Sequence, residues 1–181
     1  IQVKVKALPV FFFFYDEYSV SMNDILELNL HISSGGQYVS GVNTSATAIY
    51  DWPNPFSCHY GGNKVQMVYR ASELLAQGLT AGSEITSVAF DIAAPSSFVC
   101  YDFTIRIGAT NLDELTSNFV PFGNLTVVYN QNFTPSQAGI NTFNFTQPYI
   151  WDWVSNVVVQ TIHNQGNYGN GAGTTVKFTP K

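Results

Sequence analysis

The feature that most constrains the fold is an alternation of apolar and polar side chains with a period of two. The clearest run consists of Tyr101, Phe103, Ile105, Ile107 and Ala109, each followed or preceded by a more polar or smaller residue. Successive side chains of an extended strand point to opposite faces, so such a run predicts a strand with one face on a core. Further runs of this kind lie at residues 65–69, 88–92, 125–129, 143–145, 157–159 and 174–178.

Clusters of Gly, Pro, Asn and Ser separate these runs and predict the turns between strands. About eight short strands divided by turns predict an all-β fold, namely a jelly-roll-like β-sandwich. One or two short helical turns are expected between strands. One covers residues 72–78, with Ser72 as N-cap and Gly78 as the C-terminal stop, and the other covers residues 111–115.

The composition excludes several classes of protein. Only 10% of the 181 residues are charged and the net charge is −5, whereas 45% are hydrophobic and 15% aromatic. Disordered chains have few aromatic residues, and nucleic-acid-binding proteins need a basic surface, so neither class fits. Asn, Ser and Thr make up about a quarter of the chain. A surface of this kind is typical of extracellular β-proteins and predicts a secreted or cell-surface location.

The N-terminal part differs from the rest. Residues 1–40 are expected to be the end of a preceding β-domain or a linker, and residues 41–181 the sandwich module. No stretch reaches the roughly 20 apolar residues needed to cross a bilayer. The densest apolar run contains Phe11–Phe14, whose role the sequence does not explain. Because the chain begins at Ile1, we expect a fragment or processed form of a larger protein.

The two cysteines, Cys58 and Cys100, lie 42 positions apart. One intramolecular pairing is possible, so a disulfide is one interpretation, and two unrelated buried thiols are the other. The sequence contains no CxxC motif and no Cys/His cluster at zinc-binding spacing. A structural zinc is therefore not predicted from the sequence.

The order of the turn and strand motifs from residue 46 to residue 163 resembles a β-sandwich module of large secreted and surface proteins of Bacteroidota. The motifs are Asn54-Pro55-Phe56 and those at residues 61–62, 66–69, 71–74, 82–90, 101–108, 139–145, 150–152 and 156–159. Proteins that resemble this one are repetitive adhesins or multi-domain enzymes with accessory modules, and many use type IX secretion. The resemblance implies neighbouring domains and secretion-system components as partners. It does not extend to residues 1–45 or to the two cysteines.

Motifs for catalysis are absent from the sequence. It has no GxSxG elbow, no GxxxxGK[ST] phosphate loop and no HExxH zinc motif. His31, His59 and His163 stand in no spacing typical of a catalytic triad or a metal site. Asp91 and Asp102 fall on polar positions of their strands, where we expect solvated carboxylates. The chain is therefore predicted not to be an enzyme.

Aromatic side chains in loops are the best candidates for a binding surface, because their faces stack on sugars. The candidate ligand-binding residues are Trp52, Tyr60, Trp153, Tyr168, Asn164 and Asn167. Trp151 and Trp153 would share one face if their segment is extended. In the alternative interpretation, Trp151 belongs to the core and Trp153 partly covers a sheet edge.

Calcium is a possible structural ion, because it binds carboxylate and amide oxygens. The candidate ligands are Asp51, Asn54, Asp152 and Asn156. The alternative is that these side chains cap turns through hydrogen bonds. No other cofactor is predicted.

Together these features favour a non-catalytic extracellular module of a large cell-surface protein, acting in adhesion or surface attachment to extracellular glycans or surfaces. One alternative is a carbohydrate-binding accessory module of a secreted hydrolase. A third is a structural spacer in a surface filament.

Overall fold

The computed structural model describes residues 16–19, 24–26, 29–32, 37–39, 45–46, 54–58, 62–115, 119–164 and 173–180. For residues 16–46, 179 and 180 the description concerns the backbone. Several residues singled out in the sequence lie outside the described residues: Phe11–Phe14, Asp51, Trp52, His59, Tyr60, Asn167 and Tyr168.

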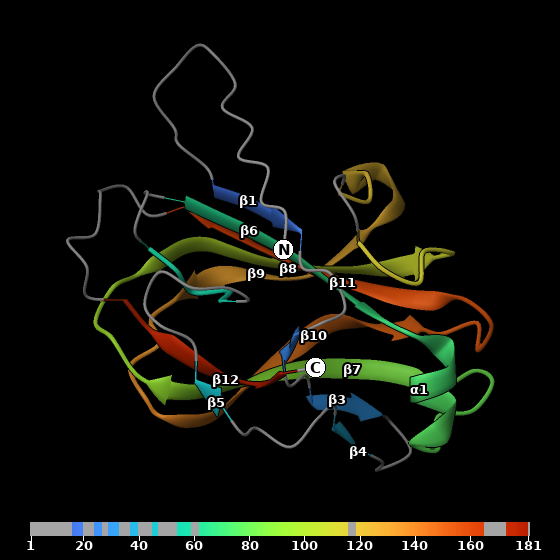
Figure 1. The fold of residues 1–181 in the computed structure, drawn as a ribbon. Coiled ribbons are helices and arrows are strands. Elements are labelled where there is room, and N and C mark those ends of the chain that lie inside the picture. Colours follow the sequence, from blue (N-terminus) through green and yellow to red (C-terminus); the bar gives the residue numbers. More distant parts are fainter. Residues whose placement is uncertain are drawn as a thin grey trace.

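Two β-sheets pack face to face as a sandwich, and Figure 1 shows them one above the other. The first sheet has the strand order β1-β6-β11-β8-β9. Its strands are β1 (Asp16–Ser19), β6 (Gly62–Tyr69), β11 (Asn156–Asn164), β8 (Cys100–Thr110) and β9 (Thr126–Phe133). Its neighbours are antiparallel, except that β1 runs parallel to β6.

The second sheet is built around β7 (Glu84–Ala94). One edge of β7 pairs with β10 (Gly139–Ile150), and the other edge pairs with β3 (Asn29–Ile32) and β12 (Thr175–Pro180). Shorter strands extend this sheet: β4 (Gln37–Val39) pairs with β3, and both β2 (Asp24–Leu26) and β5 (Ser45–Ala46) pair with β12. Strands from residues 16–39 thus join both sheets, and the domain boundary near residue 41 remains a prediction.

The all-β sandwich predicted from the sequence is confirmed. Of the six connections between β6 and β12, five cross from one sheet to the other, and only β8 and β9 form a hairpin within a sheet. Repeated crossing between layers is the pattern of a jelly roll. No helix among the described residues has the length and hydropathy needed to cross a bilayer.

Aromatic side chains fill the centre of the core between the sheets. The Phe56 ring lies 5.3 Å from Phe103, 5.5 Å from Phe133 and 5.6 Å from Phe90, measured between ring centroids. Phe143 lies 4.8 Å from Phe133 and 5.1 Å from Phe103. Phe56 precedes β6 in a turn, so this turn closes one side of the core.

A β-bulge near the start of β8 corrects the predicted alternation there. The register shifts between Cys100 and Phe103 on the β9 side, and Asp102 adopts a left-handed φ of 52°. Because of the extra residue, the side chains before the bulge point to the opposite faces from those that the alternation predicts. Tyr101 is therefore exposed and Cys100 is buried. The prediction that Tyr101 shares the core face with Phe103 is therefore wrong.

The outer face of the first sheet is also covered. Leu115, Val120, Leu125 and Val158 form a second buried cluster. The Gln66 amide holds the backbone of Val120 in both directions, with N–O distances of 2.8 and 2.9 Å. Burial on both faces explains why the valines of β11 form a continuous apolar run rather than an alternating one.

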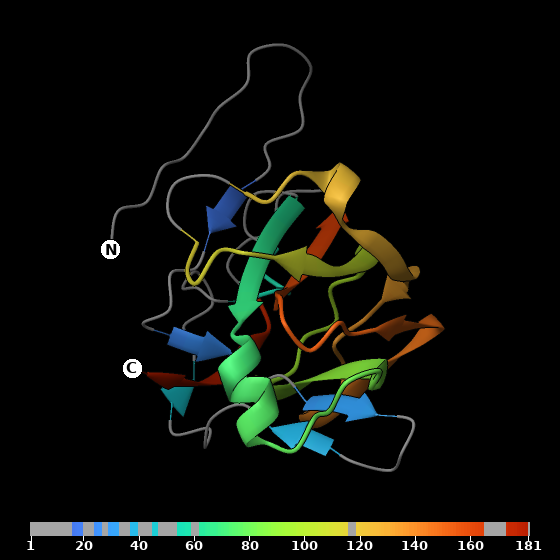
Figure 2. The same ribbon diagram turned by 90° about the vertical axis from the view of Figure 1, so that its right-hand side faces the viewer.

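The helical elements are α1 (Ala71–Ala76) and the short 3-10 helix Phe122–Asn124. Helix α1 connects the two layers (Figure 2). Its N-cap is Arg70 rather than the predicted Ser72. Its C-terminal end is as predicted, because Gly78 has a φ of 93° and Leu79 N–H bonds to the Leu74 carbonyl at 3.2 Å. Residues 111–115 form no helix, which corrects the second predicted turn.

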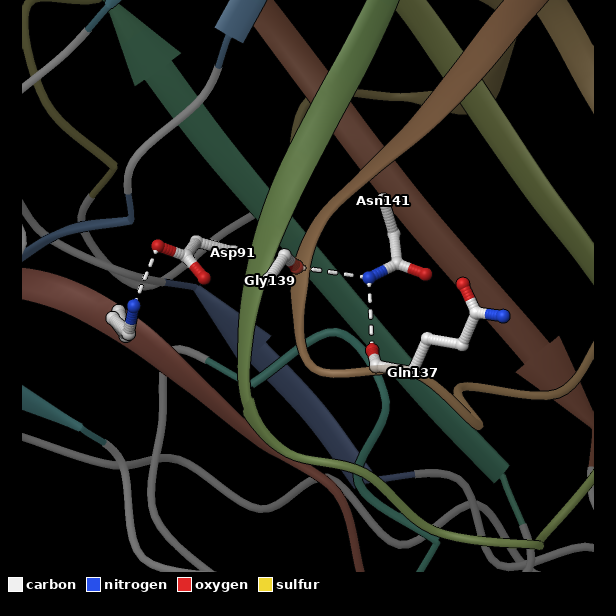
Figure 3. A network of polar contacts seen from close by, with 5 residues as sticks. Asp91, Gln137, Gly139 and Asn141 are labelled. Atoms are coloured by element: carbon white, nitrogen blue, oxygen red, sulfur yellow. Dashed lines mark hydrogen bonds and ion pairs between the residues drawn. The ribbon is translucent and has the colours of Figure 1, made fainter.

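Polar contacts fasten the second sheet near the start of β10 (Figure 3). Lys177 on β12 donates to the Asp91 carboxylate on β7 at 2.9 Å. The Asn141 amide donates to the carbonyls of Gln137 at 3.1 Å and Gly139 at 2.9 Å. Asp91 is buried, which corrects the expectation of a solvated carboxylate. Its charge is instead compensated across two neighbouring strands.

Candidate functional site

The most exposed apolar side chains that the structure describes include three in one turn. This turn, called here the Trp153 loop, covers residues 150–155 and joins β10 to β11. Ile150 is 66% exposed, Trp153 is 52% exposed and Val154 is 72% exposed. Three large apolar groups facing solvent within five residues are unusual, since isolated ones are the normal pattern on a protein surface.

Asp152 holds the loop in shape. Its Oδ1 accepts hydrogen bonds from the N–H groups of Val154 at 3.1 Å and Ser155 at 2.8 Å, and its Oδ2 accepts one from the Ser155 hydroxyl at 2.6 Å. The bond from the Ser155 hydroxyl is the main cause that lowers the pKa of Asp152, with the two backbone bonds adding to it. The carboxylate therefore stays charged and engaged within the turn.

The turn forces Trp153 into the left-handed region, with a φ of 59°. A bulky residue rarely adopts this conformation, because Cβ approaches the following carbonyl oxygen. Glycine or asparagine would adopt it with less strain. The fold thus keeps a large aromatic side chain at a position where a smaller residue would be easier to accommodate.

Trp151 anchors the Trp153 loop to the core of the sandwich. It is fully buried, its indole N–H donates to the Ser155 carbonyl at 2.8 Å, and its backbone N–H donates to the Ser83 carbonyl at 3.1 Å. The expectation that Trp151 and Trp153 share one face is wrong, because the Asp152 turn interrupts the extended chain between them. The alternative, with Trp151 in the core, is confirmed.

Asn156 connects the loop to neighbouring elements. Its Oδ1 accepts the Ala71 N–H at the start of α1 at 2.8 Å. Its Nδ2 donates to the Leu112 carbonyl at 2.9 Å and to the Asp113 carboxylate at 3.0 Å. These bonds tie the start of β11 to α1 and to the segment after β8.

The described calcium candidates are used in protein hydrogen bonds. Asn54 donates to the Thr174 carbonyl at 2.7 Å and accepts the Phe56 N–H at 3.0 Å, and Asp152 and Asn156 make the bonds given above. Asn54 and Asp152 thereby cap turns, the role that the sequence left as the alternative, whereas Asn156 bonds to residues distant in the sequence. Asp51 lies outside the described residues.

The two candidate ligand-binding residues that the structure describes, Trp153 and Asn164, lie far apart. Trp153 lies three residues before the start of β11, whereas Asn164 is the last residue of β11 and pairs with Gly62 and Tyr101. The nine residues of β11 place them about 25 Å apart at opposite ends of the sandwich. Of the predicted set, the Trp153 loop is the part that the structure supports as a surface.

A second feature was missed from the sequence. Cys58, Cys100 and His163 are all buried, and their sulfur and ring nitrogen atoms lie within 4.8 Å of one another. The sequence has no Cys/His cluster at zinc-binding spacing, and these three side chains meet because strand pairing unites residues that are distant in sequence. Both cysteines are thiols in the structure, and the predicted disulfide between them remains a prediction.

The two cysteines influence each other, and burial dominates at His163. The thiol hydrogen bond between the cysteines lowers the pKa of Cys58, against the effect of burial, and the same bond together with burial raises the pKa of Cys100. Burial lowers the pKa of His163 to about 4, although the carbonyls of Ser57 and Asn164 act in the opposite direction. The imidazole is therefore neutral at physiological pH and able to act as a ligand.

Comparisons of this chain with family models, with curated proteins and with solved structures find no match.

Proposed function

We propose that the chain is a non-catalytic module of a larger secreted or cell-surface protein and that it attaches to extracellular surfaces or glycans through the Trp153 loop. The observation that carries the proposal is the exposed, left-handed Trp153 between two further exposed apolar residues, Ile150 and Val154.

The construction of the loop supports a binding role. Backbone strain at a non-glycine residue costs about 1–3 kcal/mol and is kept where the surrounding structure enforces it, often at ligand-contacting positions. Here the Asp152 carboxylate and the buried Trp151 hold the turn around Trp153. A loop that is already ordered loses little conformational entropy when it binds.

The chemistry of the loop fits attachment. Tryptophan is the residue type most enriched at the energetic centres of interfaces, and its face also stacks on sugar rings. Low charge, a surface rich in Asn, Ser and Thr, and the resemblance to surface modules of Bacteroidota support an extracellular setting. In a repetitive parent protein, many weak loops would gain strength through avidity.

The test compares the wild-type chain with Trp153→Ala on a glycan array and on coated beads. We expect Trp153→Ala to reduce bead retention by at least about 10-fold, as for a central interface tryptophan. The matched control is Tyr101→Ala, which removes an equally accessible aromatic ring at the opposite end of the sandwich. Circular dichroism verifies that both variants are folded.

The outcomes separate the alternatives. Loss of retention with Tyr101→Ala but not with Trp153→Ala would move the binding surface to the Asn164 end. Unchanged retention with both variants, or no retention of the wild type, would favour a structural spacer. Turnover of any polysaccharide by the chain would contradict the proposal of a non-catalytic module.

A further inference from the structure

The buried Cys58, Cys100 and His163 come from three separate segments of the chain. Cys58 lies in the segment before β6, Cys100 is the first residue of β8, and His163 lies near the end of β11. Their relative exposures are 2%, 0% and 1%. The β8 bulge is what brings Cys100 to the inner face, and the β8–β11 register also shifts between Ile162 and Asn164.

Neither ring nitrogen of His163 makes a hydrogen bond of good geometry among the described residues, although the nearby backbone of Ser57 and Asn164 acts on its pKa. A neutral imidazole carries one donor and one acceptor, and buried polar atoms are almost always paired. Buried thiols pack as small apolar groups and need no such partner. The unpaired nitrogens therefore require an explanation that an ordinary core position does not supply.

We propose that Cys58, Cys100 and His163 bind a zinc ion. Thiolate sulfur and imidazole nitrogen are the ligands that zinc prefers, and zinc can be held by three protein ligands with a water molecule in the fourth position. Binding forms two Zn–S bonds and one Zn–N bond, and the two thiol protons pass to solvent. One ring nitrogen and both sulfurs then have a partner.

Charge balance selects a divalent ion. Two thiolates neutralise Zn²⁺, so the assembled centre has no net charge, which suits an apolar core lined by Phe56 and Phe103. A monovalent copper ion with the same ligands would leave one buried negative charge. The other chemistry open to these sulfurs, a disulfide, would leave both His163 nitrogens unpaired.

The ion would join elements that the backbone does not connect directly. It would tie the turn that carries Phe56 to both β8 and β11. The Cys58 thiol already lies 3.2 Å from the Phe56 carbonyl, within this turn. A metal at this place stabilises the folded state because the unfolded chain does not hold the three ligands together.

The test uses the purified 181-residue chain in the presence of a non-thiol reductant. We expect one zinc per chain by elemental analysis, and Co²⁺ substitution should produce a thiolate-to-cobalt charge-transfer band. Zinc should raise the thermal midpoint of the wild type. The band and the shift should be lost in Cys100→Ala and in His163→Gln.

The matched control is Thr161→Val. Thr161 lies two residues from His163 on the same face of β11, and its buried hydroxyl has no partner among the described residues. This variant should keep the zinc and the cobalt band. Because the cobalt spectrum is measured on the wild type, it tests the proposal even if a variant fails to fold. Absence of that band, or retention of zinc by His163→Gln, would overturn the proposal. So would a mass two hydrogens lower, with no titratable thiol, in the chain purified without reductant.

Discussion

Replacing Phe56 with alanine is expected to lower the free energy of unfolding by about 3–5 kcal/mol. Phe56 is fully buried and its ring contacts those of Phe90, Phe103, Phe133 and Phe143. Its removal leaves a cavity among rigid aromatic rings that belong to both sheets, and they cannot collapse into it. Urea unfolding, followed by tryptophan fluorescence, measures the change.

The control for this variant is Phe122→Ala. Phe122 is 47% exposed on the 3-10 helix, and Lys64 and Arg106 lie over its ring. Cation–π contacts contribute about 0.5–2 kcal/mol depending on burial, and Lys64 is buried, so the control should lose less than Phe56→Ala. Equal losses in the two variants would show that Phe56 is not at the centre of the core.

Replacing Trp151 with alanine is expected to cost about 3–5 kcal/mol of unfolding free energy and also to abolish bead retention. Trp151 is fully buried, and its indole N–H holds the Ser155 carbonyl at 2.8 Å. This variant therefore removes both a buried core side chain and the hydrogen bond that holds the Trp153 loop. Urea unfolding and the bead assay measure the two effects.

Trp151→Phe separates these effects. It keeps most of the buried apolar volume but removes the indole donor, so it should cost about 1–3 kcal/mol. We expect it to weaken retention by loosening the loop. A Trp151→Ala variant with wild-type retention would mean that the loop keeps its shape without the indole contact.

The layered β fold could be predicted because a strand with one buried face shows alternating apolar and polar side chains in its own short segment of sequence. The prediction of which side chains face the core was wrong where an inserted residue shifted the alternation by one position. One extra residue at Asp102 exposes Tyr101 and buries Cys100, and no local pattern marks such a bulge. The continuous burial of β11 likewise depends on the distant segment around Val120 that covers it.

The candidate sites differ in how much the sequence revealed. Trp153 could be identified as a loop aromatic, but its separation from Trp151 depends on the Asp152 turn and its distance from Asn164 on the length of β11. His163 could not be linked to Cys58 and Cys100, since these residues meet only through the pairing of β11 with β8 and β6. Contacts of this kind depend on topology rather than on spacing.

We propose that Trp153 serves attachment rather than stability, and Trp153→Gly separates these two roles. Glycine adopts the φ of 59° freely, which removes about 1–2 kcal/mol of strain. Its greater freedom in the unfolded chain costs about 0.5–1 kcal/mol, so the two effects nearly cancel. The measurement is the thermal midpoint of Trp153→Gly together with its bead retention. We expect an almost unchanged midpoint with retention lost. A markedly lower midpoint with full retention would show that Trp153 serves stability instead.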